Sequence, residues 1–224
     1  MPVQDKKNIF TFANLLIFLG VIFLILSFGP LLASEVWYFL KEIRHQEYIL
    51  KGKDAQEDSV FARYLSKNPV RIDPVNTNFA LVIEKIGVNA PIVANVSVAS
   101  EDAYKEALKS GVAHAISSDY PTEVASNVYL FAHASLNFWD LGKYSTVFNL
   151  IRKLNYTDKV HIFYDEKDYV YEVVNKEVVK GWNTYPLTRP TIEPILTLQT
   201  CDPPGTTINR YVVTAKLVEV NELE

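Results

Sequence analysis

The chain has 224 residues, a formal net charge of −4 and a sequence pI of about 5.6. This length allows one membrane anchor and one domain of about 150 residues. The acidic balance predicts no nucleic-acid partner, because phosphate binding needs a basic surface. A single cysteine excludes an internal disulfide and a cysteine-rich zinc site. The four histidines have no ligand spacing, so no metal or other cofactor is predicted.

An uncharged apolar run occupies residues 9–33, between Lys7 and Glu35. A helix needs about 20 apolar residues to cross a bilayer core of about 30 Å, and this run is long enough. A buried core helix would alternate with polar positions. A cleaved signal peptide would have a shorter apolar region, about 7–15 residues, and a small-residue cleavage site. The run therefore predicts an uncleaved, single-pass membrane anchor.

The charges at the two ends of this run indicate its orientation. Lys6 and Lys7 precede it, and lysines beside a first span favour a cytoplasmic N-terminus. Trp37 and Tyr38 follow it and fit an aromatic anchor at the outer interface. Residues 1–8 are thus predicted to be cytoplasmic, and everything after the span is predicted to lie outside the cell membrane.

The segment 34–70 is charged and poor in strand-forming residues. It predicts a helical or flexible stalk that holds a domain off the membrane, or simply a solvated linker. Pro69, Pro74 and the polar residues after them mark the entrance to the domain. The domain itself is predicted to occupy residues 71–224.

Strand signals dominate this domain, since short runs of alternating or β-branched residues are separated by turn residues. Helical signals are brief: Ser100, with Glu101 and Asp102, resembles an N-cap, and 145–153 has helical spacing of apolar residues. Many short strands with few small helices predict a mostly β fold, a closed barrel rich in antiparallel pairs. The predicted strands are 79–86, 90–96, 127–134, 160–164, 169–179, 195–200 and 211–220.

The candidate chemistry begins at Cys201, at the C-terminal end of a predicted strand. A loop with Pro203, Pro204 and Gly205 follows, and Arg210 opens the next strand. Consecutive strands usually neighbour one another, so the guanidinium can return to within reach of the sulfur. A buried core cysteine is the competing interpretation, because cysteine is often buried.

His133, near the end of the predicted strand 127–134, is the candidate partner of this thiol. A free thiol has a pKa near 8.5, so attack on an amide needs a neighbouring base to take the proton. An imidazole can do this and can later protonate the leaving amine. The alternative is a hydrogen-bonded histidine at the barrel rim.

These motifs resemble the sortase family. A strand that ends in TLQTC, an Arg shortly afterwards at the start of a strand, and an upstream strand that ends in His are typical of sortases. The match spans about residues 75–220, although Ala132 stands where the family usually has Gly. The loop after Cys201 is closer to class D or E patterns than to class C. Further matching segments are FALVIEKIGVNAPIV at 79–93, the Gly111–His114 segment, and NVYLFAHAS at 127–135.

The resemblance implies a cysteine transpeptidase that cleaves a sorting signal near the C-terminus of surface proteins. Cys201 would be the nucleophile that forms a thioacyl enzyme, and His133 the acid and base. Arg210 would be the oxyanion or substrate-positioning donor, and Thr200 would contact substrate. An amine from a cell-wall precursor or a pilin would then resolve the intermediate.

Two other histidines and two rival functions complete the expectations. His114 resembles a non-catalytic family histidine, and we expect it in a loop before the Tyr120–Pro121 turn. His161 lies inside a predicted strand and is expected to be structural. A surface cysteine peptidase would use the same residues, with water as acceptor. A non-catalytic β-domain that binds envelope components would need no chemistry at Cys201.

Overall fold

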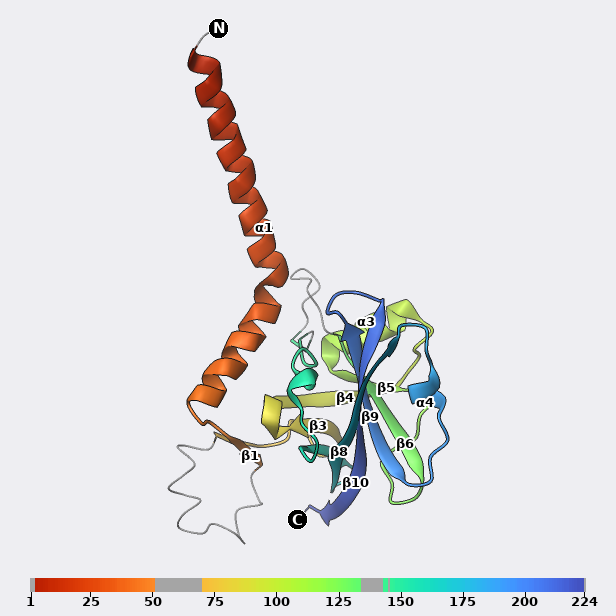
Figure 1. Cartoon of the computed structure of the whole chain (residues 1–224). Coiled ribbons are helices and arrows are strands. Elements are labelled where there is room, and N and C mark those ends of the chain that lie inside the picture. Colours follow the sequence, from red (N-terminus) through yellow and green to blue (C-terminus); the bar gives the residue numbers. More distant parts are fainter. Residues whose placement is uncertain (1–2, 51–69, 134–142, 145, 224) are drawn as a thin grey trace.

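The computed structural model describes residues 3–50, 70–133, 143–144 and 146–223 (Figure 1). Helix α1 (Val3–Ile43) contains the predicted span and continues beyond it, so the first part of the predicted stalk is helical. Within the described residues, Thr11–Ile43 is the one helix long and apolar enough to cross a membrane. Most of the remaining stalk, residues 51–69, lies outside the described residues, and the division into membrane, stalk and domain segments stays a prediction.

Eight strands form a closed barrel in the order β10-β8-β7-β3-β4-β5-β6-β9. The pairs β4–β5 and β6–β9 are parallel, and the other pairs are antiparallel. The predicted mostly β, closed barrel with an apolar N-terminal helix is therefore confirmed. The strands are β3 (Phe79–Ile83), β4 (Val88–Val96), β5 (Val112–Ala115), β6 (Ser126–Phe131), β7 (Lys159–Tyr164), β8 (Lys167–Lys180), β9 (Pro194–Asp202) and β10 (Asn209–Glu222).

Short elements decorate the barrel. Strands β1 (Tyr48–Leu50) and β2 (Val70–Ile72) form a separate parallel pair. Helix α3 (Glu101–Ser110) lies over one end of the barrel, with the backbone N–H of Ala103 donating to Ser100 Oγ at 3.4 Å (Figure 1). The N-cap is therefore Ser100, whereas Glu101 and Asp102 belong to the first turn. The other short helices are η1 (Glu84–Ile86), η3 (Ile151–Lys153) and α4 (Tyr185–Thr188).

Three predicted elements end earlier than expected or form another structure. The predicted strand 79–86 ends at Ile83, because η1 follows and closes on Gly87 at φ 64°, a conformation that favours glycine. The predicted helix 145–153 consists of turns followed by η3, and Ser145 lies outside the described residues. Strand β6 ends at Phe131, so His133 follows the strand by two residues.

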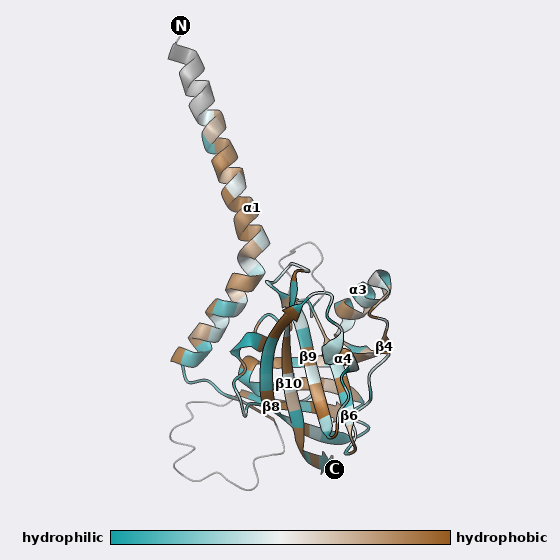
Figure 2. Ribbon diagram, turned by 45° about the vertical axis from the view of Figure 1, so that its right-hand side comes forward, coloured by the Kyte–Doolittle hydropathy of each residue, from teal (hydrophilic) through white to brown (hydrophobic). Residues whose placement is uncertain are grey.

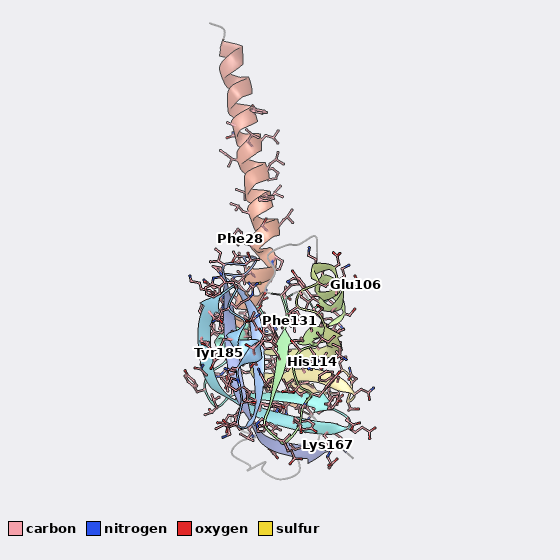
Figure 3. The ribbon with its side chains drawn as sticks, turned by 90° about the vertical axis from the view of Figure 1, so that its right-hand side faces the viewer. Phe28, Glu106, His114, Phe131, Lys167 and Tyr185 are labelled. Atoms are coloured by element: carbon pink, nitrogen blue, oxygen red, sulfur yellow. The ribbon has the colours of Figure 1, made fainter. Side chains whose placement is uncertain are left out.

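The two structural histidines occupy buried strand positions. His114 lies inside β5, not in the expected loop, and its side chain is fully buried. Its Nε2 is 3.0 Å from the Asp119 carbonyl oxygen and 3.0 Å from Ser118 Oγ. His161, as expected, lies in a strand, where its Nδ1 is 2.9 Å from Asp168 Oδ1. Figure 3 shows His114 within the barrel wall, away from the end that carries Glu106.

We predict that His114 makes the fold acid-sensitive. Burial lowers the pKa of His114 below its ordinary value, so the folded chain favours the neutral ring. The unfolded chain therefore binds the proton more readily, and stability present above about pH 6.5 is lost as the pH falls through the lower folded pKa. Chemical denaturation of the detergent-solubilised chain at a series of pH values should show this decline in the free energy of unfolding. His114→Gln cannot titrate and should show a shallower one; equal slopes would contradict the prediction.

Candidate active site

Strand β9 carries Cys201 and lies between β6 and β10. In the antiparallel pair with β10, Cys201 is directly opposite Arg210. The guanidinium Nη1 of Arg210 is 3.7 Å from Cys201 Sγ, within hydrogen-bond distance for sulfur. The sequence-based expectation that this arginine returns to the thiol agrees with the geometry.

The parallel pair with β6 brings the other candidate to the same place. The last paired residues are Phe131 and Gln199. Beyond them, the Ala132 N–H donates to the Gln199 carbonyl at 3.2 Å, and Thr200 Oγ1 donates to the Ala132 carbonyl at 2.9 Å. Two residues beyond the last pair, the same register brings His133 beside Cys201. Because paired strands lie about 4.8 Å apart, the two residues are close neighbours.

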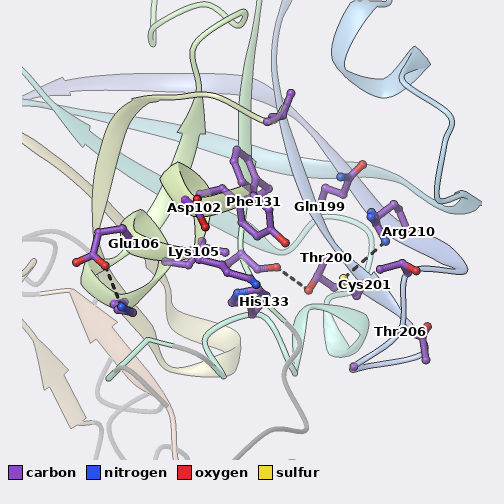
Figure 4. Close-up of a pocket in the computed structure, with 17 residues that line it drawn as sticks. Asp102, Lys105, Glu106, Phe131, His133, Gln199, Thr200, Cys201, Thr206 and Arg210 are labelled. Carbon is purple, nitrogen blue, oxygen red and sulfur yellow. Dashed lines mark hydrogen bonds and ion pairs between the residues drawn. The ribbon is translucent and has the colours of Figure 1, made fainter. Parts of the chain in front are cut away.

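The three candidate side chains line one cavity of about 660 Å³. In Figure 4, His133 and Arg210 lie on opposite sides of Cys201. Helix α3 forms one wall, and the ring of its Tyr104 meets the His133 ring edge-on, with centroids 5.9 Å apart. The cavity is lined by Val98, Asp102, Tyr104, Lys105, Glu106, Leu108, Lys109, Phe131, Ala132, His133, Gln199, Thr200, Cys201, Gly205, Thr206, Thr207 and Arg210.

The electrostatics of the cavity favour a protonated thiol. Burial raises the pKa of Cys201, and the positive charge of Arg210 opposes this effect without cancelling it. A base is therefore needed to take the proton when the sulfur attacks. His133 is the histidine that lines this cavity, so it is the side chain suited to that task.

Thr200 joins the two chain segments that carry Cys201 and His133. Its side chain is 2% exposed, and its hydroxyl donates to the Ala132 carbonyl. This bond ties the residue before Cys201 to the residue before His133. A direct contact of Thr200 with substrate stays a prediction.

Sequence reasoning missed the ion pair beside the thiol. Arg152, in η3, pairs with Asp202, the residue after Cys201, and its guanidinium lies 5.2 Å from the centre of the Tyr211 ring. The two partners are fifty positions apart and share no motif, so no spacing in the sequence points to the pair. Among the residues that the structure describes, no group of three His, Cys, Asp or Glu side chains is placed to hold a metal ion.

A barrel that brings one thiol, one imidazole and one guanidinium into a single cavity is typical of cysteine acyl transfer. The sortase domain family model matches residues 81–218, and the chain belongs to the sortase family, whose domain is a cysteine transpeptidase. No curated protein matches the chain in sequence.

Solved sortase structures share the fold. Sortase E1 from Streptomyces coelicolor is 24% identical, with a TM-score of 0.54, over 66% of this chain and 91% of that one. Sortase C-1 from Actinomyces oris is 24% identical, with a TM-score of 0.53, over 65% and 76%. Listeria monocytogenes sortase A is 22% identical, with a TM-score of 0.52, over 66% and 91%. At these identities the likeness concerns the fold alone.

The raised thiol pKa leads to a prediction for alkylation. The rate of Cys201 modification by iodoacetamide should rise with pH towards a midpoint above that of free cysteine, about 8.5. Arg210→Ala removes the opposing positive charge, so its midpoint should move further upward. Arg210→Lys keeps the charge and should move it less. A wild-type midpoint well below 8.5 would contradict this description of the thiol.

A second prediction concerns the bond between Thr200 and Ala132. Thr200→Val keeps the shape of the side chain but leaves a buried carbonyl without this donor, at a cost of about 1–3 kcal/mol. Because this carbonyl precedes His133, transfer activity should also fall, by roughly tenfold to a hundredfold. Thr200→Ser keeps the donor and should retain most of the stability and most of the transfer activity. Equal activity in the valine and serine variants would show that the bond does not position the site.

Proposed function

We propose that the protein is a membrane-anchored sortase that cleaves a C-terminal sorting signal of surface proteins and transfers them to an amine. The observation that carries this proposal is the approach of Arg210 Nη1 to within 3.7 Å of Cys201 Sγ in a cavity that His133 also lines. The acceptor amine would belong to a cell-wall precursor or to a pilin. The assignment of roles to these three residues is part of the proposal.

In the first half-reaction, His133 takes the proton from Cys201 Sγ as the sulfur attacks the carbonyl carbon of the scissile amide. Negative charge then develops on the carbonyl oxygen, and the guanidinium of Arg210 donates hydrogen bonds to it. The C–N bond breaks, His133 gives the proton to the leaving amine, and a thioester to Cys201 remains.

In the second half-reaction, the acceptor amine attacks the thioester carbonyl, and His133 takes a proton from the attacking nitrogen. Arg210 again faces the developing oxyanion. The C–S bond breaks, His133 returns the proton to the sulfur, and the new amide leaves. Each half-reaction restores His133 to the state in which the next one needs it.

The proposed location is the cell membrane, with one span and the barrel outside the cytoplasm. Its support is the apolar length of α1 and the pair Lys6 and Lys7 before it. For the subclass, the proline-rich loop 203–208 between β9 and β10 supports a class D-like or E-like enzyme over class C.

A surface cysteine peptidase is the rival reading, because the same residues would serve with water as acceptor. A non-catalytic β-domain that binds envelope components is the second rival. One experiment separates all three. The purified chain is incubated with a panel of sorting-signal peptides, with and without a nucleophilic amine, and both protein and products are followed by mass spectrometry.

We expect a thioacyl adduct on Cys201 and an amide product that requires the amine. Cys201→Ala should abolish both. Arg210→Lys should lose about 10²–10³ in rate, because lysine lacks the planar fork of donors. His133→Ala should lose roughly 10²–10⁴ in rate, which is the usual contribution of general acid–base catalysis, and should be at least as impaired as the arginine variant. Circular dichroism checks the folding of each variant.

Three outcomes would contradict the proposal. Hydrolysis that the amine never diverts would favour the peptidase. Turnover by Cys201→Ala would show that Cys201 is not the nucleophile. A loss below about tenfold in Arg210→Ala would assign the oxyanion to backbone N–H groups instead.

A further inference from the structure

The last turns of α1 have an unusual distribution of polarity. Of the three charged side chains in Leu31–Ile43, Glu35 and Lys41 contact the barrel, whereas Glu42 is exposed and, seven positions after Glu35, lies on the same side of the helix as Glu35. Glu35 Oε2 is 2.7 Å from Lys153 Nζ in η3, and Lys41 Nζ donates to the Lys85 carbonyl at 2.7 Å. Lys41 is 5% exposed, although lysine is almost never fully buried without a partner.

Aromatic residues complete this contact. Tyr38 packs against the barrel core, with Lys153 Nζ 5.6 Å from the centre of its ring. Trp37 lies directly over Gly87, where an added Cβ would come within 2.8 Å of the indole. The barrel is therefore docked on this face of the helix.

The opposite face of the same turns is apolar and bare. Residues at i, i+4, i+7 and i+11 share one side of a helix, and this spacing holds for the large apolar residues here. Their exposed fractions run from 42% to 62%. The residues of this apolar stripe are Leu32, Val36, Phe39, Leu40 and Ile43.

This arrangement inverts the polarity of an ordinary surface helix, which turns its apolar face to the protein and its charges to water. Figure 2 shows hydrophilic and hydrophobic residues mixed in these turns, whereas the helix before them is predominantly hydrophobic. A helix that lies at a lipid interface has its apolar side in the acyl boundary and its polar side away from it. The apolar stripe is continuous with the uncharged run, which is already long enough to cross the bilayer.

We propose that the segment Leu31–Ile43 rests in the outer membrane interface, with the apolar stripe in lipid and the barrel docked on its polar face. This inference rests on the membrane anchorage in the proposed function. Pro30 lies inside α1 just before the segment, and proline is a common site of helix bending, so the segment can leave the direction of the span there. The barrel is then held against the membrane surface.

The test places one fluorophore at a time on the full chain in phosphatidylcholine–phosphatidylglycerol vesicles. Cys201→Ala removes the native thiol, and Phe39→Cys supplies an attachment point for a polarity-sensitive dye in the apolar stripe. Ile17→Cys marks the span. Val124→Cys is the matched control, since Val124 is 68% exposed, compared with 62% for Phe39, and precedes β6 at the barrel end away from Cys201.

Lipids with a nitroxide near the headgroup should quench the dye at position 39 several-fold more than the dye at position 124. Lys41→Glu breaks the buried contact with Lys85. Because docking on α1 holds the barrel at the membrane, energy transfer should then show a clearly larger distance from position 124 to labelled lipid. An increase that is only slight would indicate that this contact does not hold the barrel. Lys167→Glu, the same charge reversal at the start of β8, where Lys167 pairs with Glu222, should leave this distance unchanged.

Several results would overturn the inference. A dye at position 39 that is quenched no more than the dye at position 124 would place the stripe in water. Blue-shifted emission without lipid quenching, with disulfide formation between unlabelled Phe39→Cys chains, would assign the stripe to a second copy. If the dye at position 17 were unquenched by lipids with a nitroxide in the acyl chain, the anchor itself would fail, together with this part of the proposed function.

A functional arm separates docking from catalysis. Val36→Ser, Phe39→Ser and Ile43→Ser together leave the cavity untouched, so turnover of a soluble peptide should stay the same. Turnover of the same peptide held on the vesicle by a lipid tail should fall several-fold. An equal loss with both substrates would indicate a general folding defect and contradict the specific role of the stripe. No turnover by the wild type would count against the proposed function while leaving the quenching result to stand.

Discussion

The position of β9 between β6 and β10 is the constraint on which the site depends. The antiparallel neighbour places Arg210 opposite Cys201, and the parallel neighbour leads its chain to His133 at the same end. Neither neighbour alone brings all three side chains together. Closure of the barrel fixes both pairings at once, because each strand of a closed sheet has two partners. The geometry of the cavity thus follows from strand order more than from any single contact.

Beneath the site, polar side chains connect these strands. Arg189 Nη2 donates to Thr197 Oγ1 at 2.8 Å and to Thr214 Oγ1 at 2.9 Å, which joins β9 to β10. Thr197 Oγ1 in turn donates to Asn127 Oδ1 of β6 at 2.8 Å. These buried hydrogen bonds favour one strand arrangement over its alternatives, since a slipped register would leave the bonded groups without partners. The same three strands that carry the candidate site are therefore held in register by their own threonines.

The sequence predicted the local elements well and the long-range contacts only where a motif linked them. Alternation of apolar residues located β9 and β10, strand-forming runs on either side of a turn located β7 and β8, and a turn signal joined Cys201 to Arg210. The burial of His114 in β5 was missed, because a four-residue strand carries too little periodicity to distinguish it from a loop. The Arg152–Asp202 pair was missed because it depends on how η3 folds back onto the barrel, which local pattern does not encode. The extension of α1 past the uncharged run was predicted only as one option for the stalk.

Helix η3 connects α1 with the candidate site through two consecutive residues. Lys153 pairs with Glu35 of α1, and Arg152 pairs with Asp202 beside the thiol. A partly exposed ion pair contributes only about 0–1 kcal/mol, so neither pair alone holds the barrel in place. Their value lies in geometry, because the element that contacts the last turns of α1 also supports the end of β9. A displacement of α1 would thus act on the same short helix that positions the residue next to Cys201, so α1 and the cavity share one mechanical support.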